Sequence, residues 1–300
     1  MKRDFLTLRD LSADELSAVL KRAAELKAGK DASACPLIGK SIGMLFEKAS
    51  TRTRLSFQVG IYQLGAQTVY LNPNEIQFGR GETIEDTARV LSRYLNGFIL
   101  RTFAHKTIEA FAQSAAIPVI NGLTDMHHPC QALADLMTIK EEKGGFKGVH
   151  LAYVGDGNNV ANSLIEAASM TGMEITIACP KGYEPDKAIL KKAVSEGTKA
   201  RIINDPKKAV KDADVLYTDV WVSMGQEKEA AKRKKIFKSF QINKTLLSLA
   251  KPDAVVMHCL PAHKGEEITA DAFESPQSVV FQQAENRLHA QKALLEMLIR

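Results

Sequence analysis

The sequence predicts an α/β fold of two doubly wound parallel-sheet domains, and three observations support this prediction. Short apolar segments, typical of buried strands, alternate with longer segments of helical periodicity along the whole chain. At 300 residues the chain is long for a single core, because domains commonly hold on the order of 100–150 residues. The alternation begins again after Lys143-Gly144-Gly145, and such a glycine pair can end a helix and serve as a hinge.

In the first half of the chain, apolar segments predict strands and periodic segments predict helices. The first strand, 41–46, is short and apolar, and the helix after it, 52–65, repeats apolar residues every three or four positions. The other strands are expected at 67–71, 97–101 and 118–121, and the other helices at about 11–29, 82–95, 105–116 and 128–142.

The second half repeats the pattern. Strands are expected at 149–154, 174–178, 201–203, 214–218 and 254–257, and helices at 160–171 and 284–299. In the last helix Leu288, Leu295 and Leu298 share one side. The longest irregular segments are 72–81 and 221–240, and loops of this length in compact domains are often functional.

Charge and composition argue against a nucleic-acid-binding protein. A net charge of +5 is small for this length, and one Trp and six Tyr offer few rings for stacking on bases. The densest basic run, Lys232-Arg233-Lys234-Lys235, follows Glu227 and Glu229, which favours a solvated helix or loop face.

Cysteine spacing and hydropathy favour a cytoplasmic protein without membrane contact. No two of the four cysteines form a Cys-x-x-Cys pair, which argues against a disulfide framework and a structural zinc site. The N-terminal segment predicts a charged amphipathic helix, and no apolar run approaches the roughly 20 residues that span a bilayer.

The segment Ser50-Thr51-Arg52-Thr53-Arg54 predicts an anion site where a strand passes into a helix. Two arginines and several hydroxyls lie in the first turn, where free backbone N–H groups and the helix dipole favour an anion. The guanidinium fork also matches phosphate oxygens. The alternative is an N-cap serine followed by ordinary surface arginines.

The turn Gly155-Asp156-Gly157-Asn158-Asn159 resembles a dinucleotide-binding fingerprint only in part. The third glycine is replaced, and the next strand ends in Ala178-Cys179-Pro180-Lys181 without the acidic residue that binds a ribose. Two other interpretations remain: a tight strand-to-helix turn, and a polar rim in which Asn159 bonds a small ligand.

The segment His127-His128-Pro129-Cys130-Gln131 opens a helix. A metal site is one interpretation, but no second ligand pair stands at zinc spacing. A capped helix start with a buried cysteine is another. The interpretation we favour uses His128 as a donor to a carbonyl oxygen and Gln131 as a partner for an NH₂ group.

Two further candidates follow predicted strands of the second half, where open α/β sheets bind ligands. Asp219 suits an ammonium group, although a helix-capping aspartate is the ordinary alternative. Cys259, in His258-Cys259-Leu260-Pro261, is either a reactive thiol or an inert buried one.

Four motifs occur in a fixed order along the chain: Ser50-Thr51-Arg52-Thr53-Arg54, His128-Pro129-Cys130-Gln131, Asp219 with Ser223-Met224-Gly225, and His258-Cys259-Leu260-Pro261. In this ordered set the chain, from residue 5 to 300, resembles the aspartate/ornithine carbamoyltransferase family, and within it the members that use ornithine. The resemblance implies a carbamoyl-phosphate domain at 1–143, completed by a C-terminal helix at 284–300 that packs back on it. It also implies an ornithine domain at 144–283.

The resemblance implies a role for each motif residue. Arg52, Arg101, His128 and Cys259 are the implied catalytic residues. The implied carbamoyl-phosphate contacts are Ser50, Thr51, Arg52, Thr53, Gln77, Arg101, His128, Pro129, Cys130, Gln131, Cys259, Leu260 and Arg287, with Gln77 reaching a neighbouring subunit of a homotrimer. The implied ornithine contacts are Asn159, Asp219, Ser223 and Met224.

The implied reaction converts carbamoyl phosphate and L-ornithine to L-citrulline and phosphate, a step of the arginine-biosynthesis or urea-cycle type. It needs no metal and no organic cofactor if fixed donors neutralise the developing charge. N-acetylornithine, putrescine and lysine are alternative acceptors. A nucleotide-dependent oxidoreductase and a non-catalytic amino-acid or phosphate-binding protein remain alternatives from other classes.

Overall fold

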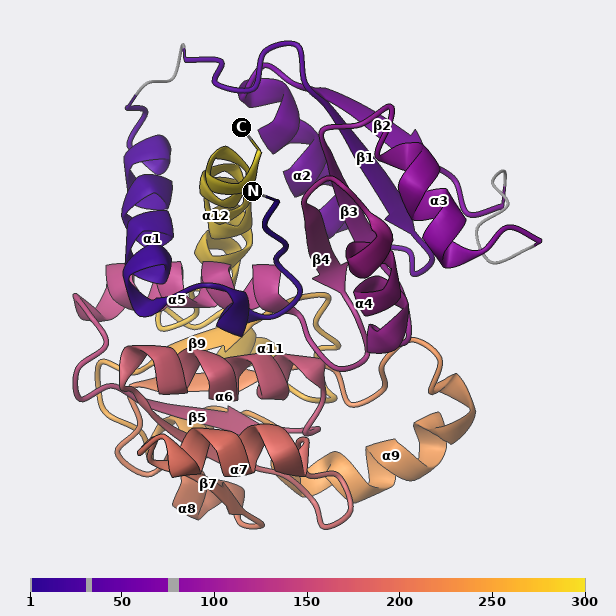
Figure 1. Ribbon diagram of the computed structural model, residues 1–300. Coiled ribbons are helices and arrows are strands. Elements are labelled where there is room, and N and C mark those ends of the chain that lie inside the picture. The colour runs from indigo at the N-terminus through magenta and orange to yellow at the C-terminus, as the bar shows by residue number, and fades with distance from the viewer. Residues whose placement is uncertain (1, 31–33, 75–80, 300) are drawn as a thin grey trace. The chain divides into compact units, whose positions relative to one another are not determined.

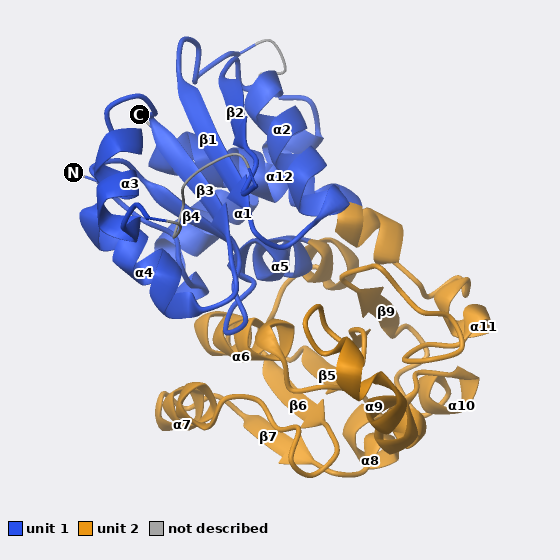
Figure 2. Cartoon of the chain, turned by 90° about the vertical axis from the view of Figure 1, so that its right-hand side faces the viewer, with its two compact units in different colours: residues 1–137, 285–300 blue, residues 138–284 orange. Residues whose placement is uncertain are grey.

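The computed structural model describes residues 2–30, 34–74 and 81–299. Two compact units can be distinguished (Figure 2): unit 1 holds residues 1–137 and 285–300, and unit 2 holds residues 138–284. The division falls within helix α5 (Pro129–Lys143).

Unit 1 is built on a parallel sheet of four strands in the order β2-β1-β3-β4. The strands are β1 (Ser41–Phe46), β2 (Gln67–Leu71), β3 (Gly97–Arg101) and β4 (Val119–Leu123). Its helices are η1 (Leu8–Asp10), α1 (Ala13–Lys27), α2 (Thr51–Gln63), α3 (Ile84–Leu91), α4 (His105–Ser114), the first part of α5, and most of α12 (Val280–Leu298).

Helices cover both faces of this sheet, as a doubly wound fold requires (Figure 1). On one face, Phe98 of β3 stacks on Phe111 of α4 with ring centroids 4.6 Å apart. On the other face lie α2 and α12. These two helices are in close contact at Gly60 of α2, where a Cβ would lie 3.1 Å from Cγ of Lys292 in α12. The C-terminal helix therefore packs on unit 1, as expected.

Unit 2 is built on a parallel sheet of five strands in the order β7-β6-β5-β8-β9. The strands are β5 (His150–Val154), β6 (Glu174–Ala178), β7 (Ala200–Ile203), β8 (Val215–Thr218) and β9 (Val255–His258). The helices are α6 (Asn159–Thr171), α7 (Lys187–Ser195), α8 (Pro206–Val210), η2 (Glu227–Glu229), α9 (Ala230–Phe237), η3 (Lys238–Phe240), α10 (Lys244–Leu247) and α11 (Ala270–Phe273).

Strand order reverses between β1 and β3 in unit 1 and between β5 and β8 in unit 2. Ligands of open parallel sheets bind beyond the carboxyl ends of the strands at such a reversal. The strand order therefore locates the candidate sites independently of any motif.

The predicted strands are all present, and four of them have the predicted bounds (β1, β2, β3 and β6). The predicted helices are present with shifted ends, the largest difference being α3, which is shorter than the 82–95 expected. The short helices α7, α8, α10 and α11 were not predicted.

The prediction of an irregular segment at 221–240 was wrong, because it contains η2, α9 and η3. Trp221, Phe237 and Phe240 anchor it by packing into the core of unit 2. The basic run inside it is only partly a solvated face: Lys232, Lys234 and Lys235 are exposed, whereas Arg233 is 4 % exposed.

Within the described parts of the chain, no helix has both the length and the apolar character needed to cross a membrane.

Candidate active site

The first turn of α2 has the features of an anion site. Ser50 is its N-cap, and its hydroxyl accepts a hydrogen bond from the Thr53 N–H at 3.2 Å. Thr51 is exposed, Arg52 is half-buried and Thr53 is buried. Arg54 lies apart from this group, because its guanidinium stacks on the Tyr70 ring, 3.8 Å from the centroid.

Arg287 of α12 joins three segments of unit 1 that are far apart in the sequence. Its Nη2 donates to Thr53 Oγ1 at 2.9 Å, and its Nη1 donates to Gln131 Oε1. The same Nη1 lies 3.4 Å from His128 Nε2. The structure thus brings together Arg287 with Thr53, His128 and Gln131, which the sequence places in three separate segments.

The Gln131 amide has a fixed orientation. Its Nε2 donates to Asp135 Oδ1 at 2.8 Å, so its Oε1 faces Arg287. An amide oxygen has two lone pairs, and Oε1 can therefore accept from a ligand NH₂ group as well as from Arg287.

His128 is held as a neutral imidazole. Burial pushes its pKa well below the ordinary value, and the positive charges of Arg287, Arg101 and Arg52 lower it further. A neutral imidazole can donate one hydrogen bond to a carbonyl oxygen without adding to the positive charge of the site.

Arg101 ends β3 and is 5 % exposed. Its Nε donates to the carbonyl oxygen of Lys48 at 3.2 Å, and Lys48 itself pairs with Asp125. Lys48 is a buried cation that was not predicted. Its position just after β1, at the carboxyl end of a strand, could have made it a candidate site residue.

Cys130 contributes packing rather than reactive chemistry. Its thiol donates to the carbonyl oxygen of Asn121 at 3.3 Å, and burial raises its pKa to about 12. Because metals bind the thiolate, this environment argues against the metal interpretation of the 127–131 segment. Pro129 is the first residue of α5 and is buried.

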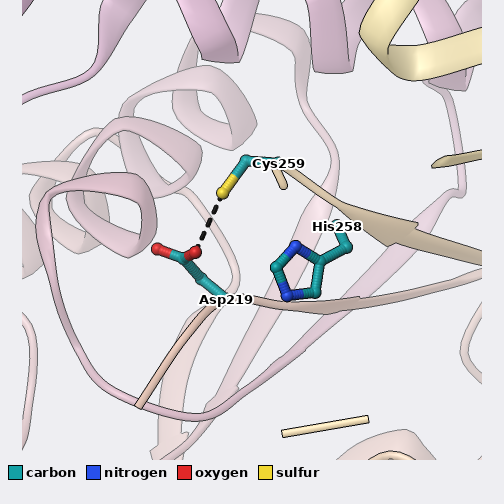
Figure 3. A group of neighbouring side chains, drawn as sticks. All are labelled: Asp219, His258 and Cys259. Carbon is teal, nitrogen blue, oxygen red and sulfur yellow. Dashed lines mark hydrogen bonds between the residues drawn. The ribbon is translucent and has the colours of Figure 1, made fainter. Parts of the chain in front are cut away.

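In unit 2, Asp219 is the centre of a hydrogen-bond cluster beyond β8. Figure 3 shows the Cys259 thiol directed at its carboxylate, with Sγ donating to Oδ1 at 2.9 Å. Asn158 Nδ2 donates to Oδ2 at 2.7 Å, and the Val220 N–H donates to Oδ1 at 2.8 Å. The cluster joins the ends of β5, β8 and β9.

His258 and Glu267 hold the Cys259 segment in place through hydrogen bonds, a role that the sequence does not predict for either residue. His258 Nδ1 accepts from the Leu260 N–H at 2.8 Å, so its proton is on Nε2, which lies 3.1 Å from Glu267 Oε1. Leu260 has a φ of +58°, a conformation that is costly for a side-chain-bearing residue. The bond to His258 helps to hold Leu260 in that conformation.

Potential ligand atoms of Asp219, His258 and Cys259 lie within 4.8 Å of one another (Figure 3). Hydrogen bonds account for this proximity: both ring nitrogens of His258 have protein partners, and the Cys259 thiol donates to Asp219. The cluster is therefore built as a hydrogen-bond network around a carboxylate.

The other predicted ornithine contacts are Asn159, Ser223 and Met224. Asn159 follows the neighbouring strand β5, and Ser223 and Met224 follow Asp219 in the sequence. Asn159 is the first residue of α6 and is half-buried, next to Asn158, the residue that touches Asp219. Ser223 and Met224 lie in the segment that leaves β8, and Met224 is 45 % exposed. Gln77 lies outside the described residues.

Gly157 of the Gly155 turn serves backbone packing. A Cβ on Gly157 would lie 2.2 Å from the backbone N of Pro185, and the Gly157 N–H donates to the Tyr183 carbonyl at 2.9 Å. A dinucleotide fingerprint uses this glycine for close approach of a pyrophosphate. Here the 183–185 backbone lies against it instead.

Two family models together match nearly the whole chain. The aspartate/ornithine carbamoyltransferase carbamoyl-P binding domain matches residues 3–141, and the Asp/Orn binding domain of the same family matches residues 147–298.

Individual proteins agree with the family models. The chain is 54 % identical to the ornithine carbamoyltransferase of Syntrophus aciditrophicus over 302 residues, covering 100 % of both chains. The solved ornithine carbamoyltransferase of Pyrococcus furiosus is 53 % identical, with a TM-score of 0.95 and coverage of 99 % of this chain and 97 % of that one. The anabolic enzyme of Campylobacter jejuni is 41 % identical, with a TM-score of 0.94 and 99 % of each chain covered. With both domain models and full-length relatives in agreement, the chain belongs to the aspartate/ornithine carbamoyltransferase family.

Proposed function

We propose that this protein transfers the carbamoyl group of carbamoyl phosphate to the side-chain amine of L-ornithine, giving L-citrulline and phosphate. The observation that supports this most directly is the cluster of Arg287, Thr53, His128 and Gln131 beside the N-terminus of α2, where the charges of Arg52 and Arg101 also lower the pKa of His128. Such a cluster matches a small ligand with a dianionic phosphate and an uncharged carbonyl group. Family membership and the named relatives support the same reaction.

Unit 1 would bind carbamoyl phosphate, in a domain of residues 1–143 and 284–300. Ser50, Thr51, Arg52, Thr53 and Arg101 would hold the phosphate. As the amine attacks, negative charge grows first on the carbonyl oxygen and then on the leaving phosphate, and fixed donors stabilise it without reorganisation. His128 would donate to the carbonyl oxygen, and Gln131 would receive the NH₂ group.

Unit 2 would bind ornithine, in a domain of residues 144–283. Asp219 would attract the cationic acceptor, with Asn159, Ser223 and Met224 completing its contacts. The amine is a nucleophile only when neutral, so its proton must leave before attack. Cys259, which already donates to Asp219, would orient the amine and handle this proton, and the departing phosphate would be the final acceptor.

The direct test is to measure citrulline formed by the purified protein from carbamoyl phosphate and L-ornithine without added cofactor. N-acetylornithine, putrescine and lysine are tested in parallel. We expect kcat/KM to be highest for ornithine. If citrulline does not form while one of the other amines is carbamoylated, the acceptor assignment is wrong. If no acceptor reacts, the proposed activity is wrong.

Replacing Cys259 with Ser is expected to preserve part of the activity, because a hydroxyl can also donate to Asp219. Cys259→Ala removes that donor and is expected to lower kcat further, by about 3- to 30-fold relative to Cys259→Ser, since an ordinary hydrogen bond is worth roughly 0.5–1.5 kcal/mol and more with a charged partner. Steady-state rates of both variants check this. A carbamoyl adduct on wild-type Cys259 in the mass spectrum, with a fully inactive Ser variant, would contradict the non-covalent role.

We further propose a homotrimer in which Gln77 completes the carbamoyl-phosphate site of a neighbouring subunit. Gln77→Ala and Arg52→Ala are each expected to be poorly active, because each puts one lesion in every site. When the two are unfolded together and refolded, some interfaces pair an intact Arg52 with an intact Gln77. Activity should then exceed the average of the parents. If hybrid trimers form but the activity does not rise above that average, Gln77 acts in the site of its own chain or in no site.

No disulfide joins the four cysteines, all of which lie among the described residues, and this supports the proposal that the protein acts in a reducing compartment such as the cytoplasm. The packing of the 183–185 backbone against Gly157 argues against the oxidoreductase alternative.

A further inference from the structure

A buried ion pair connects the Gly155 turn with helix α9 in unit 2. Arg233 of α9 is 4 % exposed and Asp156, two residues beyond β5, is 7 % exposed. Arg233 Nη2 donates to Asp156 Oδ2, and Arg233 Nε donates to the Trp221 carbonyl oxygen at 2.5 Å. One guanidinium therefore fixes two segments at once, the strand-end turn and the start of the 221–240 segment.

Aromatic rings enclose the same guanidinium. Its carbon lies 4.8 Å from the Tyr183 ring centroid and 5.3 Å from that of Phe237. The exposed Glu229 carboxylate also lies 3.9 Å from Nη1. A planar fork that donates in two directions and stacks on rings is specific to arginine, and lysine cannot reproduce it.

Asp156 lies close to Asp219. The two residues follow the adjacent strands β5 and β8, which Thr218 Oγ1 joins by donating to the Val154 carbonyl at 2.6 Å. Burial raises the pKa of Asp156 to about 6, an effect that Arg233 opposes and Asp219 reinforces. Two carboxylates thus lie beyond the carboxyl ends of adjacent strands, and Arg233 forms an ion pair with Asp156.

The segment that Arg233 anchors carries two of the proposed acceptor contacts. Trp221 is the second residue after Asp219, and Ser223 and Met224 follow it. The Trp221 side chain is in the core, but the carbonyl that orients the next peptide is bonded to Arg233. Loss of this bond would free the backbone at 221–224 without touching any residue proposed to contact a substrate.

Resting on the function proposed above, we propose that Arg233 is a positioning residue for the acceptor amine. It fixes the 221–224 backbone through the Trp221 carbonyl, and it holds the Asp156 carboxylate in an ion pair so that Asp156 does not compete with Asp219 for the cationic amine.

The test compares Arg233→Met, Arg233→Lys and the double variant Asp156→Asn/Arg233→Met with the wild type. In Arg233→Met we expect the ornithine KM to rise by about 10- to 100-fold, the size of effect that small displacements of positioning groups produce. The KM for carbamoyl phosphate should change less than about twofold. Arg233→Lys should resemble Arg233→Met, because an ammonium cannot make both hydrogen bonds.

The double variant separates the two parts of the role. It also removes the carboxyl group that Arg233→Met leaves without its partner, so it should recover part of the ornithine KM, while the Trp221 anchor stays lost. Amide hydrogen exchange over 221–237 gives a readout independent of activity, and should be faster in each Arg233 variant than in the wild type. If Arg233→Met does not fold, the ornithine KM and the amide exchange of the double variant and of Arg233→Lys are compared with the wild type instead.

Three results would overturn the proposal. The first is an ornithine KM within threefold of the wild type in every Arg233 variant. The second is unchanged exchange at 221–237. The third is an equal rise in both KM values with a lowered Tm, which would indicate a purely structural role. A wild type that makes no citrulline would instead contradict the proposed function, and the exchange comparison would still test the anchor.

Discussion

Replacing Arg52 with Ala is expected to lower kcat/KM for carbamoyl phosphate by about 30- to 1000-fold. Arg52 lies in the first turn of α2, close enough to His128 to lower the pKa of that imidazole. A charge-assisted contact to a group whose negative charge grows in the transition state is worth roughly 2–4 kcal/mol. Each 1.36 kcal/mol is about a factor of ten in rate. Steady-state kinetics with varied carbamoyl phosphate measures this loss.

Arg54→Ala is the matched control. It removes the same side chain two residues further along the same helix, where the guanidinium stacks on Tyr70 and is exposed. Its effect on kcat/KM should stay within about threefold, because an exposed cation–π contact is worth only about 0.5–1 kcal/mol. An Arg52→Ala loss below threefold, or equal losses in both variants, would remove Arg52 from the phosphate site.

The parallel sheets were predictable from the sequence because their strands are buried on both sides. Residues 42–46 and 97–100 are buried throughout, and such strands appear as continuous apolar runs. The helices were less predictable where tertiary contacts override local pattern. In α9 the buried positions are Arg233 and Phe237, and a buried arginine between lysines cannot be told from a solvated one by periodicity.

The candidate site, too, was predictable only where local sequence pattern was enough. Each motif marked a strand end or helix start, and position in an α/β sheet was enough to make Asp219 and Cys259 candidates. Nothing in the spacing predicts that Arg287 meets Thr53 and Gln131, because that contact depends on how α12 packs on α2 and α5. The role of Asn158, whose side chain both caps α6 and donates to Asp219, is likewise not predictable from the sequence.

Protonation states also depend on tertiary structure. The motif His128-Pro129-Cys130 does not indicate whether the imidazole is charged or neutral. Burial and three arginines make His128 neutral, which turns a possible cation into a hydrogen-bond donor for a carbonyl oxygen.

Replacing Asp219 with Asn is expected to lower kcat/KM for ornithine by about 30- to 1000-fold and to leave the KM for carbamoyl phosphate nearly unchanged. The carboxylate accepts from the Cys259 thiol, Asn158 Nδ2 and the Val220 N–H. An amide has only one acceptor oxygen, so at least one of these donors would face an NH₂ group. The variant also loses the charge that attracts the amine, and truncating one partner of a buried charged contact costs roughly 2–5 kcal/mol.

Asp212→Asn makes the same chemical change at an exposed position of the same unit. Asp212 has a φ of +57°, which asparagine adopts readily, so this variant should fold and behave as the wild type. Kinetics with each substrate varied in turn separates the two KM values. If Asp219→Asn shifts both KM values equally, the carboxylate holds the shape of the strand ends but does not receive the amine. If it shifts neither, the acceptor binds elsewhere, and the hydrogen bonds that converge on Asp219 serve only the fold.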